Sequence, residues 1–346
     1  MAIPLPSQFR SATEFSFRDD QAEAIIRTVS YPRDDLCRTV IWFPPENHNG
    51  IRPSIARHLP RATSYLGLGG GLLDRLPLEL CSLGVTLWHD ILLRIDIHSL
   101  FKFRQANPRS RELVDSLHEY QSVVSHGLNL YCALLRTQVA KRFSLFYVYD
   151  ALCTKTCTIC GEFAGFISLL TWKRCCFICL RTAPKTRVHT RANIRMQMRL
   201  NRSQTERLVS FKTLPGAYGY DGRHFDEDTF VVGGVRRPLT LHPRNKILRY
   251  MGMCALPYYD RQTRKVDHGV SCSGCRLAVA KGLVRNHDRS RNLSGEVQDR
   301  LFTPDGLLEH FRWCEQAQLL WRSSDEGKTQ PSELSTGDVQ YFGESA

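Results

Sequence analysis

The sequence has no long hydrophobic run, and no stretch reaches the roughly 18 apolar residues that a membrane-spanning helix needs. Its first fifteen residues, MAIPLPSQFRSATEF, contain no continuous apolar segment like the core of a secretory signal. We therefore expect an intracellular protein of the cytoplasm, the nucleus or both, neither secreted nor transmembrane. Such compartments keep thiols reduced, so disulfide bonds are not expected.

Catalytic signatures are also missing. The sequence carries no HExxH motif, no nucleotide-binding motif and no grouping that suggests a Ser–His–Asp triad. The glycine-rich stretch LGLGGGLL at 66–73 lacks the GK[ST] ending of a phosphate-binding loop and the GxGxxG spacing of a dinucleotide site, so we interpret it as a hinge. We expect no catalytic residue and no enzymatic activity.

Acidic residues are few: 34 Asp and Glu stand against 47 Lys and Arg, for a formal net charge of +13. This balance favours acidic partners such as nucleic acid, although scattered basic residues can also simply keep a protein soluble. The excess is strongest at 181–212, where nine basic residues face one acid, Glu206. Arg191, Arg195 and Arg199 recur there every four residues, so they would line one helix face toward an acidic partner.

Cysteine is plentiful, with thirteen residues, and the best-spaced set is Cys157-x2-Cys160-x15-Cys176-x2-Cys179. A CxxC turn places two thiolates on one side of a metal ion, and two such turns complete the tetrahedron that zinc prefers. We therefore predict a structural four-cysteine zinc site, with the apolar segment between the pairs forming a short hairpin. Four thiolates would leave no open position for catalysis.

A second set lies downstream and consists of Cys272, Cys275, His310 and Cys314. The first two form another CxxC turn. His310 and Cys314 lie four positions apart on a helix predicted for 303–321, which would place both on one face. We predict a second, CCHC-type structural zinc site, closed across a loop of 34 residues. Because each set closes on four ligands of its own, the interleaved arrangement of a RING domain is not expected.

Alternatives remain open at both sites. The cysteines of the first site could instead be free, buried thiols. At the first site Cys175 competes with its neighbour as the third ligand, and Cys153 is interpreted as a helix-packing residue. At the second site Cys254 could replace a ligand, or His310 could be an ordinary half-buried histidine while Cys314 packs against the adjacent tryptophan.

Apolar periodicity predicts a mostly helical chain with a strand-rich middle. The predicted helices are 89–96, 97–106, 108–117, 127–143, 144–153 and 303–321. Ser144 and Thr303 are expected to cap their helices, and Pro304 to begin the last one. Residues 213–265 have the composition of strands and turns, and no internal repeat is present.

The stretch LLDRLPLEL, at 72–80, followed by HDILLRIDIHSLFKFRQANPRSRELVDSL, at 89–117, resembles an F-box. The matching positions are Leu73, Leu76, Pro77, Glu79, Leu80, Ile91, Leu92, Ile95, Asp96, Ser99, Leu100, Phe103, Arg104, Asn107, Arg111, Leu113 and Val114. Together with YDALC…CTIC…RCCFICL, SCSGC and LLEHFRWCEQAQLLW, the arrangement resembles filamentous-fungal F-box proteins with a cysteine-rich, zinc-binding region after the box.

The resemblance implies a substrate receptor of an SCF-type cullin–RING ubiquitin ligase. Its F-box would dock a Skp-type adaptor on the cullin scaffold, and the rest of the chain would hold an unknown protein target. The implied adaptor-binding residues are Leu76, Pro77, Leu80, Ile91, Leu92, Ile95, Leu100 and Phe103. Fourteen positions separate Pro77 from Ile91, against seven in the usual pattern, which places an insertion at 81–88.

The expected fold is α+β and mainly helical, with a three-helix F-box, a helical linker, a small zinc-stabilised hairpin module, a strand-rich middle and a zinc-clasped C-terminal helix. The expected units are an N-terminal extension with a Gly-rich hinge, partly disordered (1–71), the F-box (72–118), a helical region with the four-cysteine zinc module (119–190), a basic, strand-rich region (191–260), a CCHC-type zinc region (261–322) and a disordered tail (323–346). The competing function is a zinc-stabilised nucleic-acid-binding protein that uses 181–212. Few aromatic residues interleave the basic residues there, which leaves base stacking little to work with.

Overall fold

The computed structural model describes residues 10–43, 85–226, 229–235, 239, 246–284 and 293–331. Within these ranges the chain forms helices and short antiparallel strands, so the predicted α+β class is confirmed at this coarse level. None of the described helices is long and apolar enough to cross a membrane. Buried apolar residues form a main core, a second core around the C-terminal helices, and a small third cluster.

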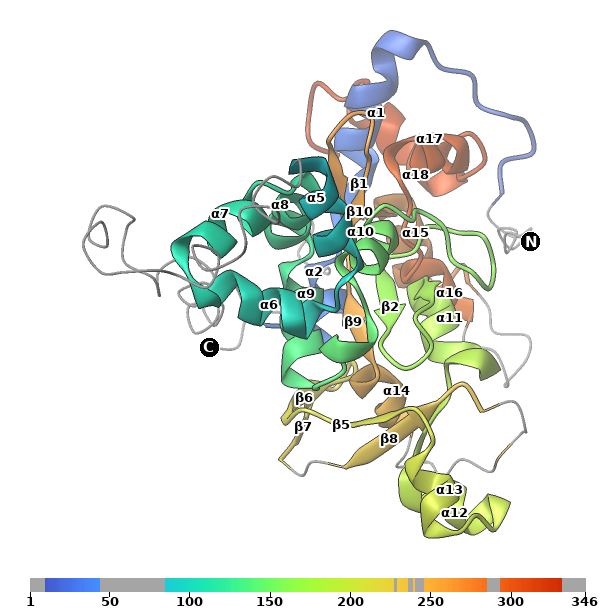
Figure 1. Ribbon diagram of the computed structural model, residues 1–346. Coiled ribbons are helices and arrows are strands. Elements are labelled where there is room, and N and C mark those ends of the chain that lie inside the picture. The colour runs from blue at the N-terminus through green and yellow to red at the C-terminus, as the bar shows by residue number, and fades with distance from the viewer. Residues whose placement is uncertain are drawn as a thin grey trace.

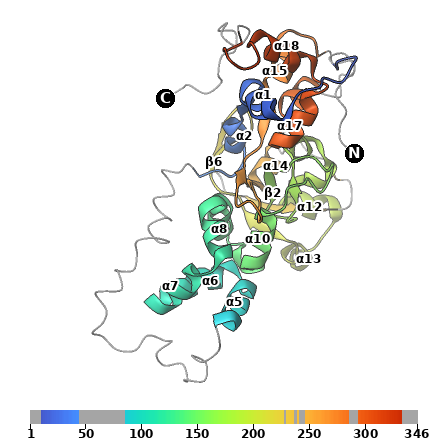
Figure 2. The same cartoon turned by 90° about the horizontal axis from the view of Figure 1, so that it is seen from above.

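A run of helices forms one half of the molecule. These are α5 (Val85–Arg94), α6 (Ile97–Ala106), α7 (Pro108–Asp115), α8 (His118–His126), α9 (Leu128–Arg136) and α10 (Leu145–Leu152). Asp96 caps α6, because its carboxylate accepts hydrogen bonds from the Ser99 amide (3.0 Å) and hydroxyl (2.7 Å). Asn107 caps α7 through the Ser110 amide, and Pro108 takes the first helical position. In Figure 2, α5 and α7 lie at the opposite end of the molecule from α15 and α18.

The predicted helix at 127–143 is shorter in the structure. The helix α9 ends at Arg136, Gln138 adopts a left-handed backbone conformation (φ 61°), and the chain continues as the short 3₁₀ helix η5 (Ala140–Arg142). A left-handed residue cannot continue a right-handed helix, so the apolar periodicity spans two elements. Ser144 precedes α10 without a side-chain capping bond, contrary to the prediction. The helix α8 was not predicted, since only Tyr120 and Val123 are large buried residues on it.

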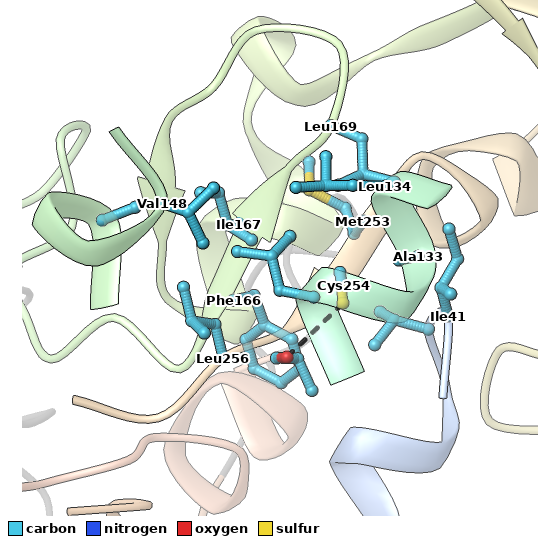
Figure 3. Packing of buried hydrophobic residues seen from close by; sticks show 14 of the residues in the cluster. Ile41, Ala133, Leu134, Val148, Phe166, Ile167, Leu169, Met253, Cys254 and Leu256 are labelled. Carbon is cyan, nitrogen blue, oxygen red and sulfur yellow. Dashed lines mark hydrogen bonds between the residues drawn. The ribbon is translucent and has the colours of Figure 1, made fainter. Parts of the chain in front are cut away.

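A three-stranded antiparallel sheet packs beneath these helices. Its strands, in the order β3-β2-β9, are β3 (Arg174–Cys175), β2 (Phe166–Ser168) and β9 (Met253–Ala255). The β2–β3 pair is the hairpin predicted between the two CxxC turns. Ile167 and Cys254 lie opposite each other on β2 and β9, and they pack in the main core with Leu134 of α9 and Val148 of α10 (Figure 3).

The middle of the chain combines short strands with short helices. Its elements are α11 (Phe177–Thr182), η6 (Pro184–Thr186), β4 (Val188–Thr190), α12 (Arg191–Met198), α13 (Arg202–Glu206), β5 (Ser210–Lys212), β6 (Gly216–Tyr218), β7 (Arg223–Phe225), β8 (Phe230–Gly233), α14 (Leu248–Met251), β10 (Tyr258–Tyr259) and β11 (Val266–Asp267). Strand β8 lies between β4 and β5, while β6 pairs with β7 and β10 with β11. The region 191–260, which was predicted to be basic and strand-rich, therefore contains strands, but it begins with the helices α12 and α13.

The C-terminal part forms a second module with its own core. Its elements are β12 (Val270–Cys272), α15 (Ser273–Ala280), α16 (Leu293–Gln298), α17 (Pro304–Phe311) and α18 (Glu315–Ser323). The helices α15 and α18 approach closely at Gly274, where an added Cβ would overlap the Ala317 amide nitrogen. Only glycine fits this crossing, so the closeness of the two helices depends on it.

The N-terminal segment belongs to this same module. It forms η2 (Asp19–Gln21), α1 (Ala22–Val29) and β1 (Ser30–Pro32), and the following α2 (Asp34–Arg38) packs its Leu36 in the main core instead. Strand β1 pairs with β12, Ser30 opposite Cys272, and the rings of Phe15 and Phe17 contact Phe311 edge-on at 5.3 and 5.9 Å. Figure 1 shows the blue α1 beside the orange-red α17 and α18, so segments from the N-terminal and C-terminal parts of the described chain build one unit.

Two predictions about the chain ends need correction. The N-terminal extension was expected to be partly disordered, yet residues 19–38 form helices and a strand, because their apolar side chains are buried against elements far away in sequence. The tail was expected to be disordered from residue 323, yet the Thr329 amide donates to the Ser324 carbonyl (2.9 Å) and Ser324 is buried. The predicted hinge at 66–73, the start of the F-box at 72–84 and the tail beyond residue 331 lie outside the described residues.

A buried ionic cluster around Asp299 joins the modules. The Asp299 carboxylate accepts hydrogen bonds from Arg33 (3.1 Å), which precedes α2, and from Arg181 of α11 (2.9 Å). The Tyr220 hydroxyl, between β6 and β7, also donates to it. One buried carboxylate thus receives donors from three other segments, which compensates for its removal from water.

Candidate metal centres

The predicted ligands assemble into two separate groups. In each group the four ligand atoms lie within 4.8 Å of one another. The first group is Cys157, Cys160, Cys176 and Cys179, and its Cys160 and Cys176 sulfurs lie 3.5 Å apart. A tetrahedron with zinc–sulfur bonds of about 2.3 Å has sulfur–sulfur edges of about 3.8 Å. The group therefore fits a tetrahedral metal of this size.

Tight turns shape both halves of the first group. In the first turn the Cys157 amide donates to the Glu162 carbonyl (2.7 Å) and the Gly161 amide donates to the Cys157 carbonyl (2.9 Å). Gly161 has a φ of 84°, which glycine adopts without strain. In the second turn Cys176 caps α11, and its sulfur accepts a hydrogen bond from the Cys179 amide (3.3 Å). Amides that donate to sulfur stabilise the thiolate, which is the form that binds a metal.

The thiols of the first group influence one another electrostatically. Hydrogen bonds with Cys160, and then with Cys176 and Cys179, lower the pKa of the Cys157 thiol well below its usual range. Hydrogen bonding to Cys157 raises the pKa of Cys176 and of Cys179. By contrast, simple burial raises the pKa of Cys175, which lies outside the group. The structure thus selects Cys176 over Cys175 as the third member.

A buried arginine fixes the first CxxC turn in place. The Arg174 guanidinium donates to the carbonyl oxygens of Thr154 (3.1 Å), Leu256 (2.7 Å) and Pro257 (3.2 Å), and also to that of Ala164. Thr154 and Ala164 stand on either side of the turn, and the other two residues follow β9. Arg174 therefore clamps both ends of the turn to the sheet.

Arg174→Met is expected to destabilise the fold by several kcal/mol, because it leaves four carbonyl groups without their donor and each such loss costs about 1–3 kcal/mol. We expect a reduced free energy of unfolding and weaker metal retention at the first centre, measured by urea titration and by metal content after dialysis. Lys173→Met is the matched control, since Lys173 is the adjacent, exposed residue. Equal unfolding free energies for the two variants would refute the clamp.

The second group is fully buried in the C-terminal module. Cys272 ends β12, Cys275 lies in the first turn of α15, His310 in the last turn of α17, and Cys314 directly before α18. The Cys272 and Cys314 sulfurs are 3.9 Å apart, and the Cys275 sulfur is 3.2 Å from Nε2 of His310. For a tetrahedral zinc these separations would be about 3.8 and 3.6 Å. The geometry fits a CCHC site.

The helix predicted for 303–321 is two helices in the structure. Thr303 caps α17 by accepting from the Gly306 amide (3.1 Å), and Pro304 begins it, as predicted. The chain then turns, and the Gln318 side-chain amide donates to the carbonyls of Phe311 (3.1 Å) and Arg312 (2.9 Å) at the end of α17. These bonds satisfy the carbonyls that a continuing helix would have used. The break places Cys314 at the start of α18 instead of mid-helix.

Electrostatics in the second group resemble those in the first. Hydrogen bonds with Cys275 and Cys314 hold the pKa of Cys272 well below its usual range, and hydrogen bonding to Cys272 raises the pKa of the other two thiols. The His310 ring packs at 4.5 Å from the Phe302 ring, which orients the imidazole. If His310 and Cys314 were ordinary packing residues, nothing would explain why all four side chains converge on one point.

The remaining candidate cysteines lie elsewhere. Cys254 is buried in the main core (Figure 3), where its sulfur accepts from Asn129 Nδ2 (3.1 Å) and burial raises its pKa, so it does not replace a ligand of the second group. Cys153 follows α10 and stays outside both groups. No disulfide bond joins any of the cysteines in the described part of the chain.

The predicted arginine stripe is only partly formed. Arg191 and Arg195 lie on α12, but Arg199 ends the helix in a left-handed conformation (φ 53°), so it leaves the common face. The Arg191 guanidinium lies 4.1 Å from the Phe230 ring and also donates to the Ser210 hydroxyl. Arg191 thereby helps to hold α12 on the sheet, and the prediction that three arginines line one helix face toward an acidic partner needs correction.

The predicted adaptor-binding residues divide into three sets. Leu76, Pro77 and Leu80 lie outside the described residues. Leu92 and Leu100 are 1% and 0% exposed in the main core, where they hold the helices together and offer no side-chain surface. Ile91 is 40% exposed, and Ile95 and Phe103 are half-buried.

Sequence analysis missed part of the exposed apolar surface. Leu87 of α5 is 43% exposed, and Phe146 and Tyr147 of α10 are 52% and 56% exposed. The helices α5 and α10 contact each other, although they lie far apart in sequence. Apolar periodicity marks all these residues alike, so it could not tell exposed positions from buried ones.

Comparison with protein-family models, with curated proteins and with solved structures found no match. The interpretation of the two centres therefore rests on their geometry and ligand chemistry.

Proposed function

We propose that both centres hold structural zinc. Thiolate and imidazole ligands in a tetrahedral arrangement suit zinc, and four protein ligands leave no position for a reacting molecule. When bound, the metal would cross-link distant backbone segments and supply no reactive site. At the first centre it would join the turn after α10 to α11, and at the second it would join β12 and α15 to α17 and α18.

We further propose that the chain is an F-box substrate receptor of an SCF-type ubiquitin ligase, acting inside the cell and making no covalent bond itself. The observation that carries this proposal is that two contacting helices, α5 and α10, expose the large apolar side chains of Leu87, Ile91, Phe146 and Tyr147. Large apolar side chains on a small helical unit are typical of protein-binding surfaces. The unit lies at one end of the molecule, which leaves the other end for a target protein (Figure 2).

The test is a pull-down of the full, metal-loaded chain with a purified fungal Skp-type adaptor. The wild-type chain is expected to bind, and Ile91→Asp combined with Phe146→Asp is expected to weaken binding at least about tenfold, because a charge would be buried in an apolar contact. Leu319→Asp is the matched control, since Leu319 is an apolar residue of α18 with 39% exposure.

Metal content and melting temperature should be measured on each variant, so that unfolding is not mistaken for lost binding. A folded, metal-loaded wild-type chain that fails to bind the adaptor would overturn the receptor proposal. Equal loss of binding in Leu319→Asp would show that the surface of α5 and α10 is not the docking site.

A further inference from the structure

A pocket of about 440 Å³ lies on the C-terminal module and belongs to neither metal-ligand group. Three segments that are far apart in sequence line it. They are Arg27, Thr28, Ser30 and Tyr31 from α1 and β1, Ser273 and Arg276 from α15, and residues 327–331 after α18. The volume is within the range of about 300–1,000 Å³ that small-molecule sites occupy.

The charged residues that line this pocket are all basic. They are Arg27, Arg276 and Lys328, and no carboxylate occurs among the described lining residues. Lys328 also pairs with Asp325 at 3.3 Å, an exposed contact that leaves further ammonium hydrogens available. Two guanidinium groups and an ammonium around one concave space favour an anion that can accept several hydrogen bonds.

The walls of the pocket are fixed by packing. Gly327 has a φ of 81°, and a Cβ there would lie 2.9 Å from the Trp321 ring and 3.0 Å from the Thr28 hydroxyl. Its amide donates to the Ser324 hydroxyl (2.9 Å), which anchors the segment to the end of α18. On the opposite wall the Arg276 guanidinium lies 5.2 Å from the Tyr31 ring, which positions it by a cation–π contact. The pocket therefore has packed walls, and Arg276 is held on one of them, while Arg27 and Lys328 are exposed at its surface.

We propose that this pocket binds a small, hydroxyl-rich molecule that carries a phosphate monoester. The basic side chains match the phosphate, since a guanidinium fork and an ammonium both donate to tetrahedral oxyanions. The polar side chains of Ser30, Ser273, Thr329 and Gln330 supply hydrogen-bonding groups for the hydroxyl-bearing part of the ligand.

The test is isothermal titration calorimetry of the full, metal-loaded chain with glucose 6-phosphate, inorganic phosphate and glucose, at constant ionic strength. Glucose 6-phosphate is expected to bind one per chain, more tightly than inorganic phosphate, and glucose is expected not to bind. Arg276→Gln and Lys328→Gln should each weaken the binding of the sugar phosphate at least about tenfold. Arg195→Gln, which changes an exposed arginine on α12, should leave the affinity unchanged.

Lys328 is exposed, so Lys328→Gln keeps the test decisive if Arg276→Gln fails to fold. A dissociation constant for glucose 6-phosphate weaker than about 1 mM would overturn the proposal. Equal weakening by Arg195→Gln would overturn it too, because the effect would then be one of net charge and not of this pocket. Equal affinity for inorganic phosphate would refute the role of the hydroxyl-bearing part.

Discussion

Cys179→Ser is expected to remove the metal from the first centre and to unfold the region around it, residues 144–190. The change leaves three thiolates, and structural zinc supplies roughly 10–16 kcal/mol in small sites. That amount is comparable with the total stability of an ordinary domain, about 5–15 kcal/mol. Cys179 lies on α11, whose Phe177 packs in the main core, so the loss would spread into that core.

Metal content per chain is the primary measurement, and it should fall from two ions to one. Hydrogen exchange should show faster amide exchange across residues 144–190. Cys153→Ser is the control, because Cys153 lies close to the first CxxC turn in sequence but outside the ligand group, and it should keep both ions. Unchanged metal content and melting temperature in Cys179→Ser would refute the first centre.

Cys275→Ser is expected to release the N-terminal segment while leaving the first centre loaded. The second core contains three of the four ligands together with Ile25 and Val29 of α1. Strand β1 pairs directly with Cys272 and its neighbours. Without the metal, the surface that holds residues 10–32 loses its cross-link, and the segment should detach.

Limited proteolysis and hydrogen exchange measure this release. Amides of α1 and β1 should exchange at least about a thousandfold faster, which corresponds to about 4 kcal/mol, while those of α10 and α11 should be unaffected. Cys37→Ala, a change in the nearby α2, should leave exchange in α1 as in the wild type. Protection of α1 that persists in metal-depleted Cys275→Ser would show that apolar packing alone retains the segment.

The sequence predicted well which residues gather into the two groups that could hold a metal ion, because their spacing is local. Each CxxC turn is four residues long, and His310 and Cys314 remain linked by a hydrogen bond from the Cys314 amide to the His310 carbonyl (3.0 Å) even though their helix breaks. Local chemistry also located the starts of α7 and α17, where Pro108, Pro304 and Thr303 have their usual positions. How the two halves of each site come together could be seen only in the folded structure.

Features that depend on distant contacts could not be predicted. Nothing beside Arg174 in the sequence indicates that its guanidinium would be buried among four carbonyl groups. The role of Gln318 in ending α17 depends on a turn that periodicity does not encode. Leu92 and Ile91 are neighbours of similar character, yet one is buried and the other exposed, because packing between helices decides which side of α5 faces inward.

The pairing of β1 with β12 also sets an order of events during synthesis. The ligands of the first centre lie between Cys157 and Cys179, so this centre can close while later residues are still being made. The second must wait for Cys314, about 280 residues after Ser30, which at about 5–20 residues per second takes roughly 15–60 s. Over that interval Phe15, Phe17 and the apolar face of α1 have no surface to pack on. During synthesis the nascent chain therefore exposes the apolar side chains of this segment. Chaperones that shield them would govern the yield of folded protein.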